Sequence, residues 1–196
     1  SRQEFLNRLR GEAGRAGERK ADGQPGDDKE PFVSLQQFAR GQAAQLAYCQ
    51  EKNYEIAADA YQKAIASGFS NKVWLAEAHH RLGVAWDAKG QMEKAKAELL
   101  TSLSIRPNVP EVLNNLGTVH RKLGEKTAAL SLFEKAVVLR PNYAMARYNL
   151  ANAYEATNPK RAIAEYETFI ALVEGIPDEE GRMLHAKERI EKLKKL

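Results

Sequence analysis

The sequence repeats itself at a fixed interval of 34 residues. Leu116-Gly117 follows Leu82-Gly83 at this interval, and Arg140-Pro141-Asn142 follows Arg106-Pro107-Asn108 at the same one. A fixed period of this length is typical of stacked repeats, in which each unit buries its apolar face against the next. We therefore predict an array of similar units.

One unit, residues 110–143, shows what each repeat folds into. It carries two apolar stripes whose three- and four-residue spacings are those of one helix face. Gly124 lies between the stripes, where a helix end favours a residue that tolerates positive φ, and Pro141 cannot continue a helix. The unit is therefore predicted to be a helix-turn-helix hairpin. The stripes are Leu113, Leu116, Val119, His120 and Leu123, then Ala129, Leu132, Phe133, Ala136 and Val137.

The recurring Leu-Gly, aromatic, Ala and Pro positions resemble the tetratricopeptide repeat over roughly residues 38–172. This resemblance implies an all-α fold, a right-handed superhelix of about four hairpins with a C-terminal capping helix. The expected repeats span residues 38–71, 76–109, 110–143 and 144–176, within an array that covers residues 34–175. Residues 1–33 are expected to form a flexible charged leader, and residues 177–196 the capping helix.

The first repeat departs most from the pattern. Ser34 and Gln37 have the spacing of a capping box, so a helix is predicted from Ser34 to about Glu51, followed by a second helix over residues 54–67. Gln45 is assigned to the place that Gly83 and Gly117 occupy in later copies. Because that place normally holds a small residue, looser packing is expected there.

Two further departures separate the later repeats. About four extra residues before Ala76 predict that the next helix starts early, with Ser70 as its cap. Trp74 then packs on the previous repeat or stays exposed as an anchor for a partner. In the fourth repeat Asn158 is predicted to cap a helix whose first residue is Pro159.

The last segment runs from acidic to basic, which complements a helix dipole, and Met183, Ala186, Ile190 and Leu193 form one apolar stripe. A capping helix is the preferred interpretation, because an open array exposes the apolar face of its last hairpin. A helix at a membrane surface and a dimerisation seam are the alternatives.

Composition narrows the classes of function. The net charge of +4 is too small and too dispersed to predict nucleic-acid binding. The sequence contains no apolar run long enough to span a membrane, so membrane insertion is not predicted. The single cysteine, Cys49, excludes an internal disulfide and fits a reducing, cytoplasmic location, although a signal upstream of Ser1 stays open.

No catalytic constellation is recognisable, so we predict no enzyme activity, no cofactor and no metal site. His79 and His80 are adjacent and point to different sides of a helix, so they do not form a ligand pair. His120 takes the place of Trp86 and Tyr154 in neighbouring copies and is predicted to be a packed core residue. Cys49 has no evident partner base.

In proteins of this family the first helix of each hairpin lines a concave groove that suits a peptide or a helix of a partner. Asn115 and Asn149 are equivalent, and their carboxamides could bond a peptide backbone. They resemble the asparagine ladder of O-linked N-acetylglucosamine transferase. Basic residues would meet an acidic group, and Tyr148 would offer an aromatic contact. The predicted groove residues are His80, Arg81, Asn114, Asn115, Thr118, Arg121, Lys122, Tyr148, Asn149 and Asn152.

The sequence thus predicts a non-enzymatic adaptor that binds a protein partner, in the assembly of a multiprotein complex. Two alternatives stay open: the recognition arm of a larger enzyme such as a glycosyltransferase, and a self-assembling scaffold. The carboxylate clamp of repeat proteins that bind heat-shock chaperones is not predicted, because the matching positions lack its lysine pair.

Overall fold

The computed structural model describes residues 29–46 and 53–195, and all regular secondary structure in this part of the chain is helical. The elements, in chain order, are α2 (Lys29–Leu46), α3 (Tyr54–Ala66), α4 (Lys72–Ala88), α5 (Met92–Ile105), α6 (Pro110–Lys122), α7 (Lys126–Leu139), α8 (Ala144–Tyr154), α9 (Pro159–Val173), the 3₁₀ turn η1 (Pro177–Glu179) and α10 (Glu180–Leu193).

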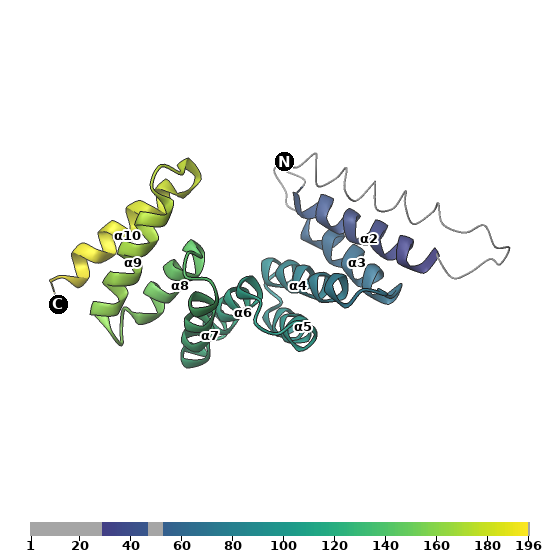
Figure 1. Cartoon of the computed structure of the whole chain (residues 1–196), viewed down its shortest axis with the longest axis horizontal. Helices are drawn as coiled ribbons and strands as arrows, with labels where there is room; N and C mark the ends of the chain where they lie inside the picture. The colour runs from purple at the N-terminus through teal and green to yellow at the C-terminus, as the bar shows by residue number, and fades with distance from the viewer. Residues whose placement is uncertain (1–28, 47–52, 196) are drawn as a thin grey trace.

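Consecutive helices pair as hairpins, and consecutive hairpins stack. The closest pairs are α2 with α3, α4 with α5, α6 with α7, and α8 with α9, and each hairpin also packs on the next. Figure 1 shows that the stack bends into an arc, with α4, α6 and α8 toward its inside and α5 and α7 on its outside. The predicted superhelical array of helical hairpins is confirmed.

Two kinds of glycine make these hairpins tight. A Cβ atom added at Gly117 would lie 2.6 Å from Cε1 of Phe133, and one at Gly83 would lie 2.8 Å from Cγ of Leu99. The two helices of these two hairpins can therefore approach only because Gly83 and Gly117 lack a side chain. The turn glycines Gly90 and Gly124 instead adopt φ values of +75° and +82°, which other residues rarely tolerate.

The first repeat follows the same rule in a different register. A Cβ at Gly41 would lie 2.7 Å from Cε1 of Tyr61, so Gly41 is the close-approach position and the assignment of Gln45 to it is wrong. Gly41 and Tyr61 are 20 residues apart, whereas Gly117 and Phe133 are 16 apart. The first hairpin therefore contains four extra residues, which displaced the alignment by one helical turn.

Helix starts were predicted with mixed success. Asn158 caps α9 by accepting from the backbone N–H of Arg161, with Pro159 at the first helical position, as predicted. Asn71, not Ser70, caps α4 through the N–H of Val73 at 2.8 Å.

The predicted cap at Ser34 is wrong. Helix α2 begins at Lys29, and Pro31 is tolerated in its first turn because the N–H groups there have no partner within the helix. Ser34 is a buried residue of the helix interior, and its hydroxyl donates to the carbonyl of Gly68. Residues 29–33 of the predicted leader thus belong to α2, while residues 1–28 and Cys49 lie outside the described residues.

The buried side chains form two clusters. The N-terminal cluster is centred on Phe38, Tyr61, Leu82 and Leu99, and Trp74 packs against it with its ring 5.5 Å from that of Phe38. The interpretation of Trp74 as a packing residue is therefore confirmed. The C-terminal cluster is centred on Phe133, Leu150, Tyr166 and Phe169.

Helix α10 closes the C-terminal end of the array. Ala186, Ile190 and Leu193 are buried in the C-terminal cluster, and α10 packs on α9. Charged residues of α10, including Lys187, Glu188 and Glu191, are exposed. This arrangement is that of the predicted capping helix, which covers the last hairpin with a polar outer surface.

Candidate interaction surface

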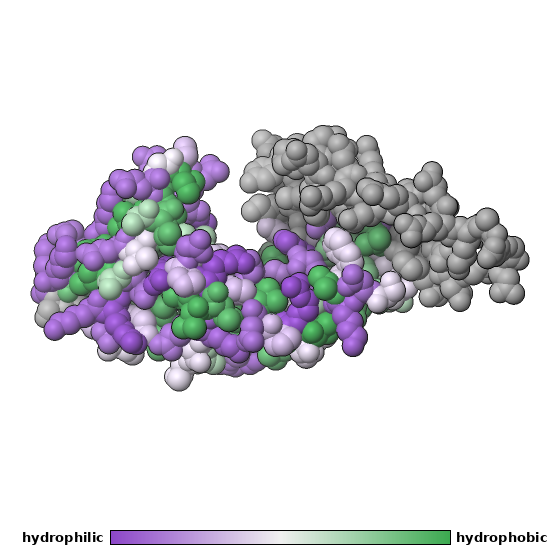
Figure 2. All heavy atoms as spheres, in the orientation of Figure 1, coloured by the Kyte–Doolittle hydropathy of each residue, from purple (hydrophilic) through white to green (hydrophobic). Residues whose placement is uncertain are grey.

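We use concave face for the inward surface of α4, α6 and α8. Figure 2 shows hydrophilic side chains along the hollow of the arc. The sequence-predicted residues come from these three helices, but the structure gives them different environments. Some are half-exposed, whereas His80 and Asn114 are buried, with 5% and 3% of their surface accessible.

A chain of hydrogen bonds connects the three helices. Asn149 donates from Nδ2 to Oδ1 of Asn114 at 2.8 Å, and Nδ2 of Asn114 lies 3.5 Å from Oδ1 of Asn115. Nδ2 of Asn115 in turn lies 2.9 Å from Nε2 of His80. The predicted pair of equivalent asparagines is thus joined through Asn114 and continues to a histidine on α4.

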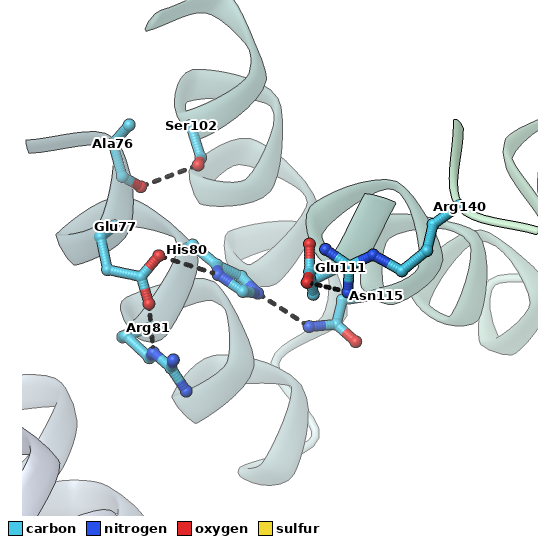
Figure 3. Close-up of polar contacts among 8 residues, drawn as sticks. All are labelled: Ala76, Glu77, His80, Arg81, Ser102, Glu111, Asn115 and Arg140. Atoms are coloured by element: carbon cyan, nitrogen blue, oxygen red, sulfur yellow. Dashed lines mark hydrogen bonds and ion pairs between the residues drawn. The ribbon is translucent and has the colours of Figure 1, made fainter. Parts of the chain in front are cut away.

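Glu77 ends this chain on α4 (Figure 3). Its Oε1 accepts from Nε of Arg81 at 2.6 Å, and its Oε2 lies 3.6 Å from Nδ1 of His80. Burial raises the pKa of this carboxyl, but the hydrogen bonds with His80 and Arg81 and the positive charge of Arg81 outweigh it, so the pKa is lowered. Glu77 therefore stays ionised at neutral pH and orients both neighbours.

The C-terminal ends of α4 and α6 meet through a salt bridge. Lys122 donates from Nζ to both carboxylate oxygens of Asp87 at 2.7 Å. Arg121 is exposed beside this pair, and the hydroxyl of Thr118 donates to the carbonyl of Asn114 at 3.1 Å within α6. Of the two predicted cations, Lys122 is paired with Asp87, whereas Arg121 forms no salt bridge with a described residue.

Tyr148 lies in an aromatic cluster rather than standing free in the groove. Its ring centroid is 5.1 Å from that of Phe169 and 6.0 Å from that of Tyr166. Its hydroxyl lies 2.9 Å from Nδ1 of His185 on α10, and Asn152 donates from Nδ2 to its carbonyl. Tyr148 thus joins the capping helix to the concave face and remains half-buried.

Sequence reasoning missed a pocket at the edge of the concave face. It has a volume of about 430 Å³ and combines α4, the turn between α5 and α6, the start of α6 and the residue that follows α7. The signal that could have found it was the recurring Arg-Pro-Asn, which places Arg106 and Arg140 in equivalent turns. Its lining residues are Glu77, His80, Arg81, Arg106, Pro107, Asn108, Val109, Pro110, Glu111 and Arg140.

The histidines make polar contacts of an ordinary kind. Nδ1 of His79 lies 2.7 Å from a carboxylate oxygen of Glu98, and His120 is packed with Nδ1 against Glu125. Within residues 29–46 and 53–195, no group of three or more His, Cys, Asp or Glu side chains is placed to hold a metal ion. No helix in this part of the chain has the length and apolar character needed to cross a membrane.

Two consecutive repeats of this chain match a known protein family. The tetratricopeptide repeat family matches residues 76–109 and, separately, residues 110–143. The tetratricopeptide repeat domain-containing protein PYG7, chloroplastic, of Arabidopsis thaliana is 29% identical over 96 residues, which cover 49% of this chain. The match covers 32% of that relative, so this chain spans about a third of its length.

Solved structures show the same architecture. YrrB, a repeat protein with an unusual peptide-binding site, has a TM-score of 0.62 at 20% identity, over 94% of this chain and 86% of its own. The first repeat domain of Spaghetti (RPAP3), bound to the HSP90 peptide SRMEEVD, has a TM-score of 0.54 at 19% identity, over 61% and 90%. From the stacked hairpins, their close-approach glycines and the two family matches, we conclude that this chain is a tetratricopeptide repeat protein.

Proposed function

We propose that this protein is a non-enzymatic adaptor that holds an extended peptide or a helix of a partner protein against its concave face. Repeats of this family generally act as interaction modules, and solved proteins of the same fold bind peptides. The observation that carries the proposal is the row of linked amides on α6 and α8, two helices on the inside of the arc (Figure 1).

The amides keep hydrogen-bonding capacity beyond their contacts with one another. A carboxamide has two N–H donors and an oxygen that accepts twice, and Asn115 and Asn149 are only half-buried. Asn115 is held in place by its contacts with His80 and Asn114, and Asn149 by its bond to Asn114. Fixed donors and acceptors lose little freedom on binding, so such a row favours contacts with the backbone of an extended peptide.

The chaperone-binding mode of Spaghetti does not transfer to this chain. With the first repeat in its corrected register, the clamp positions hold Phe38 and Gln42, then Arg81, then Glu111 and Asn115. One cation is present, and the lysine pair that would neutralise a terminal carboxylate is missing. The proposed partner is therefore a peptide or helix of a different kind.

A display library of random 12-residue peptides, selected on the immobilised protein, tests the proposal. Isothermal titration then measures the dissociation constant of a selected peptide for the wild type and for Asn149→Ala combined with Arg121→Ala. Both positions belong to the predicted groove residues, and we expect affinity to fall about tenfold, as for the loss of one or two hydrogen bonds to the ligand.

Ser131→Ala combined with Lys135→Ala is the matched control, because both positions are exposed on α7, outside the arc. Its affinity should equal that of the wild type. Selected peptides that bind the concave variant as tightly as the wild type, or that lose affinity for the α7 variant, would place the binding site elsewhere and reject the proposal.

A further inference from the structure

The pocket at the edge of the concave face has an arrangement of charge that its repeat neighbour lacks. Counting along the 34-residue period, Glu77 corresponds to Glu111, Arg81 to Asn115 and Arg106 to Arg140. All of these residues except Asn115 line the pocket. The two repeats therefore offer a direct comparison of how the same acid and the same arginine are used.

In the third repeat the acid and the arginine neutralise each other. Arg140 forms an ion pair with Glu111 (Figure 3). Asn115, the equivalent of Arg81 in this repeat, is uncharged and does not compete for the carboxylate of Glu111. In the second repeat Arg81 and His80 hold Glu77 on α4 instead. Arg106 consequently has no acidic partner among the described residues, and it is exposed.

The surroundings of Arg106 favour an anion. Val109 precedes α6 and provides no side-chain hydrogen bond to the first turn of that helix, whose N–H groups carry the positive end of its dipole. His80 lines the same pocket, and its Nδ1 faces Glu77 at 3.6 Å. Within the part of the chain that the structure describes, two features of one pocket thus remain without a counterpart: the Arg106 guanidinium and an uncapped helix start.

The charge of the pocket indicates which anion fits. Its lining holds the three arginines Arg81, Arg106 and Arg140 against the two carboxylates Glu77 and Glu111, which leaves one positive charge when His80 is neutral. A single carboxylate balances that charge, whereas a doubly charged phosphate would leave an excess of negative charge beside two glutamates.

We infer that this pocket binds the carboxylate of an aspartate or glutamate side chain in the bound peptide, with Arg106 as its guanidinium partner. The planar guanidinium can bond a carboxylate through two parallel N–H groups. The inference rests on the proposed function for the way in which the peptide lies along α4 and α6, and it adds a specificity for acidic residues at the edge of the groove.

A small probe tests the pocket without a known partner. Acetyl-Gly-Glu-Gly-amide is titrated into the ¹⁵N-labelled protein at constant ionic strength, and acetyl-Gly-Gln-Gly-amide serves as its neutral match. We expect the glutamate probe to shift the Nε–Hε resonance of Arg106 and the backbone amides of Asn108 and Glu111 in a saturable way. The glutamine probe should shift them far less.

Arg106→Gln should weaken binding of the glutamate probe about fivefold, the upper range for a partly exposed ion pair. Lys135→Gln removes the same charge from the outer surface of α7 and should leave binding unchanged. Thermal unfolding of both variants checks that each remains folded, which exposed positions allow.

The inference is overturned if both probes shift the same resonances equally, if Arg106→Gln binds the glutamate probe like the wild type, or if a phosphoserine analogue binds more tightly than glutamate. These outcomes are separate from those of the library experiment. Library peptides that depend on Asn149 but not on Arg106 would keep the adaptor and reject the pocket. If the glutamate probe binds at Arg106 but the library yields no peptide that depends on Asn149 and Arg121, the pocket is kept and the adaptor is rejected.

Discussion

Gly117 sets the distance between α6 and α7. The ring of Phe133 occupies the space where a Cβ atom would be, and this ring is fully buried, so it cannot move aside without disturbing the C-terminal cluster. Gly181, in the first turn of α10, contrasts with it, because nothing lies within 4 Å of an added Cβ there.

Gly117→Ala should lower the free energy of unfolding by about 1–3 kcal/mol, the usual range for overpacking a core. Gly181→Ala should leave it unchanged or raise it by up to about 1 kcal/mol, because alanine favours the helix. Urea unfolding followed by circular dichroism measures both. Equal midpoints for the two variants would contradict the role of Gly117.

Glu155 is a charged residue that ties α8 to α10. Its Oε1 accepts from Nε of Arg189 at 2.7 Å and from the hydroxyl of Tyr166 at 2.6 Å. Burial raises the pKa of this carboxyl. The hydrogen bonds from Arg189 and Tyr166 and the charge of Arg189 lower the pKa and together outweigh burial, so the net shift is downward.

The sign of this shift predicts acid sensitivity. A carboxyl whose pKa is lower in the folded state stabilises the protein above the unfolded pKa of about 4.3, and this contribution is lost as pH falls toward the folded value. Glu155→Gln should therefore cost about 1 kcal/mol at pH 7 and flatten the decline of stability below about pH 4.5. Unfolding midpoints measured from pH 7 to pH 3 test this. Glu188→Gln, at an exposed position of α10, should retain the wild-type slope.

Among the elements, α10 shows how an array ends. One side of the helix buries Ala186, Ile190 and Leu193, whereas Leu184 on another side is 60% exposed. The stripe was readable from the sequence because its residues recur at helical spacing. The same spacing also allowed a membrane-surface helix or a dimerisation seam, and only the contact with α9 selects the cap.

Ile190→Ala should lower the free energy of unfolding by about 2–4 kcal/mol, because it removes buried methyl groups and leaves a cavity. Leu184→Ala truncates a similar aliphatic side chain on the same helix and should change it by less than about 0.5 kcal/mol. Hydrogen exchange of α9 amides offers a local measurement. Protection that is as high in Ile190→Ala as in the wild type would mean that α10 does not stabilise the last hairpin.

At the scale of the whole molecule, the two apolar clusters meet at few places. Leu103 on α5 and Leu132 on α7 are partly buried, and both pack against the N-terminal and the C-terminal cluster. Because each repeat contacts only its neighbours, the coupling between the two halves of an array depends on such shared contacts.

Leu103→Ala combined with Leu132→Ala should uncouple the halves. Both tryptophans, Trp74 and Trp86, belong to the N-terminal cluster, so their fluorescence follows that half, whereas circular dichroism follows all helices. We expect the two signals to share one urea midpoint in the wild type and to separate in the double variant.

Leu130→Ala is the control for this experiment, because Leu130 packs only against the C-terminal cluster. Leu130→Ala should lower the urea midpoint by the same amount in the fluorescence signal and in the circular dichroism signal. Coincident transitions in the double variant would show that the halves are coupled through other contacts.

The sequence by itself determined the repeat, the hairpin and the ends of several helices. Period, apolar spacing and cap chemistry depend on residues close together in the chain, which is why Gly124, Asn158 and the α10 stripe were predicted correctly. Ser34 was misassigned because a serine that can cap a helix can equally bond a distant carbonyl, here that of Gly68. Gln45 was misassigned because an insertion of four residues preserves the helical face while shifting the register.

Only the tertiary structure decided how the concave-face residues are used. Periodicity placed His80, Asn115 and Asn149 on one face, but whether a side chain there bonds a neighbouring repeat or faces solvent depends on distances between helices. The pocket at Arg106 shows the same limit. Equivalent arginines stand in two turns. The competition of Arg81 for Glu77, a contact set in three dimensions, leaves Arg106 without an acidic partner among the residues that the structure describes.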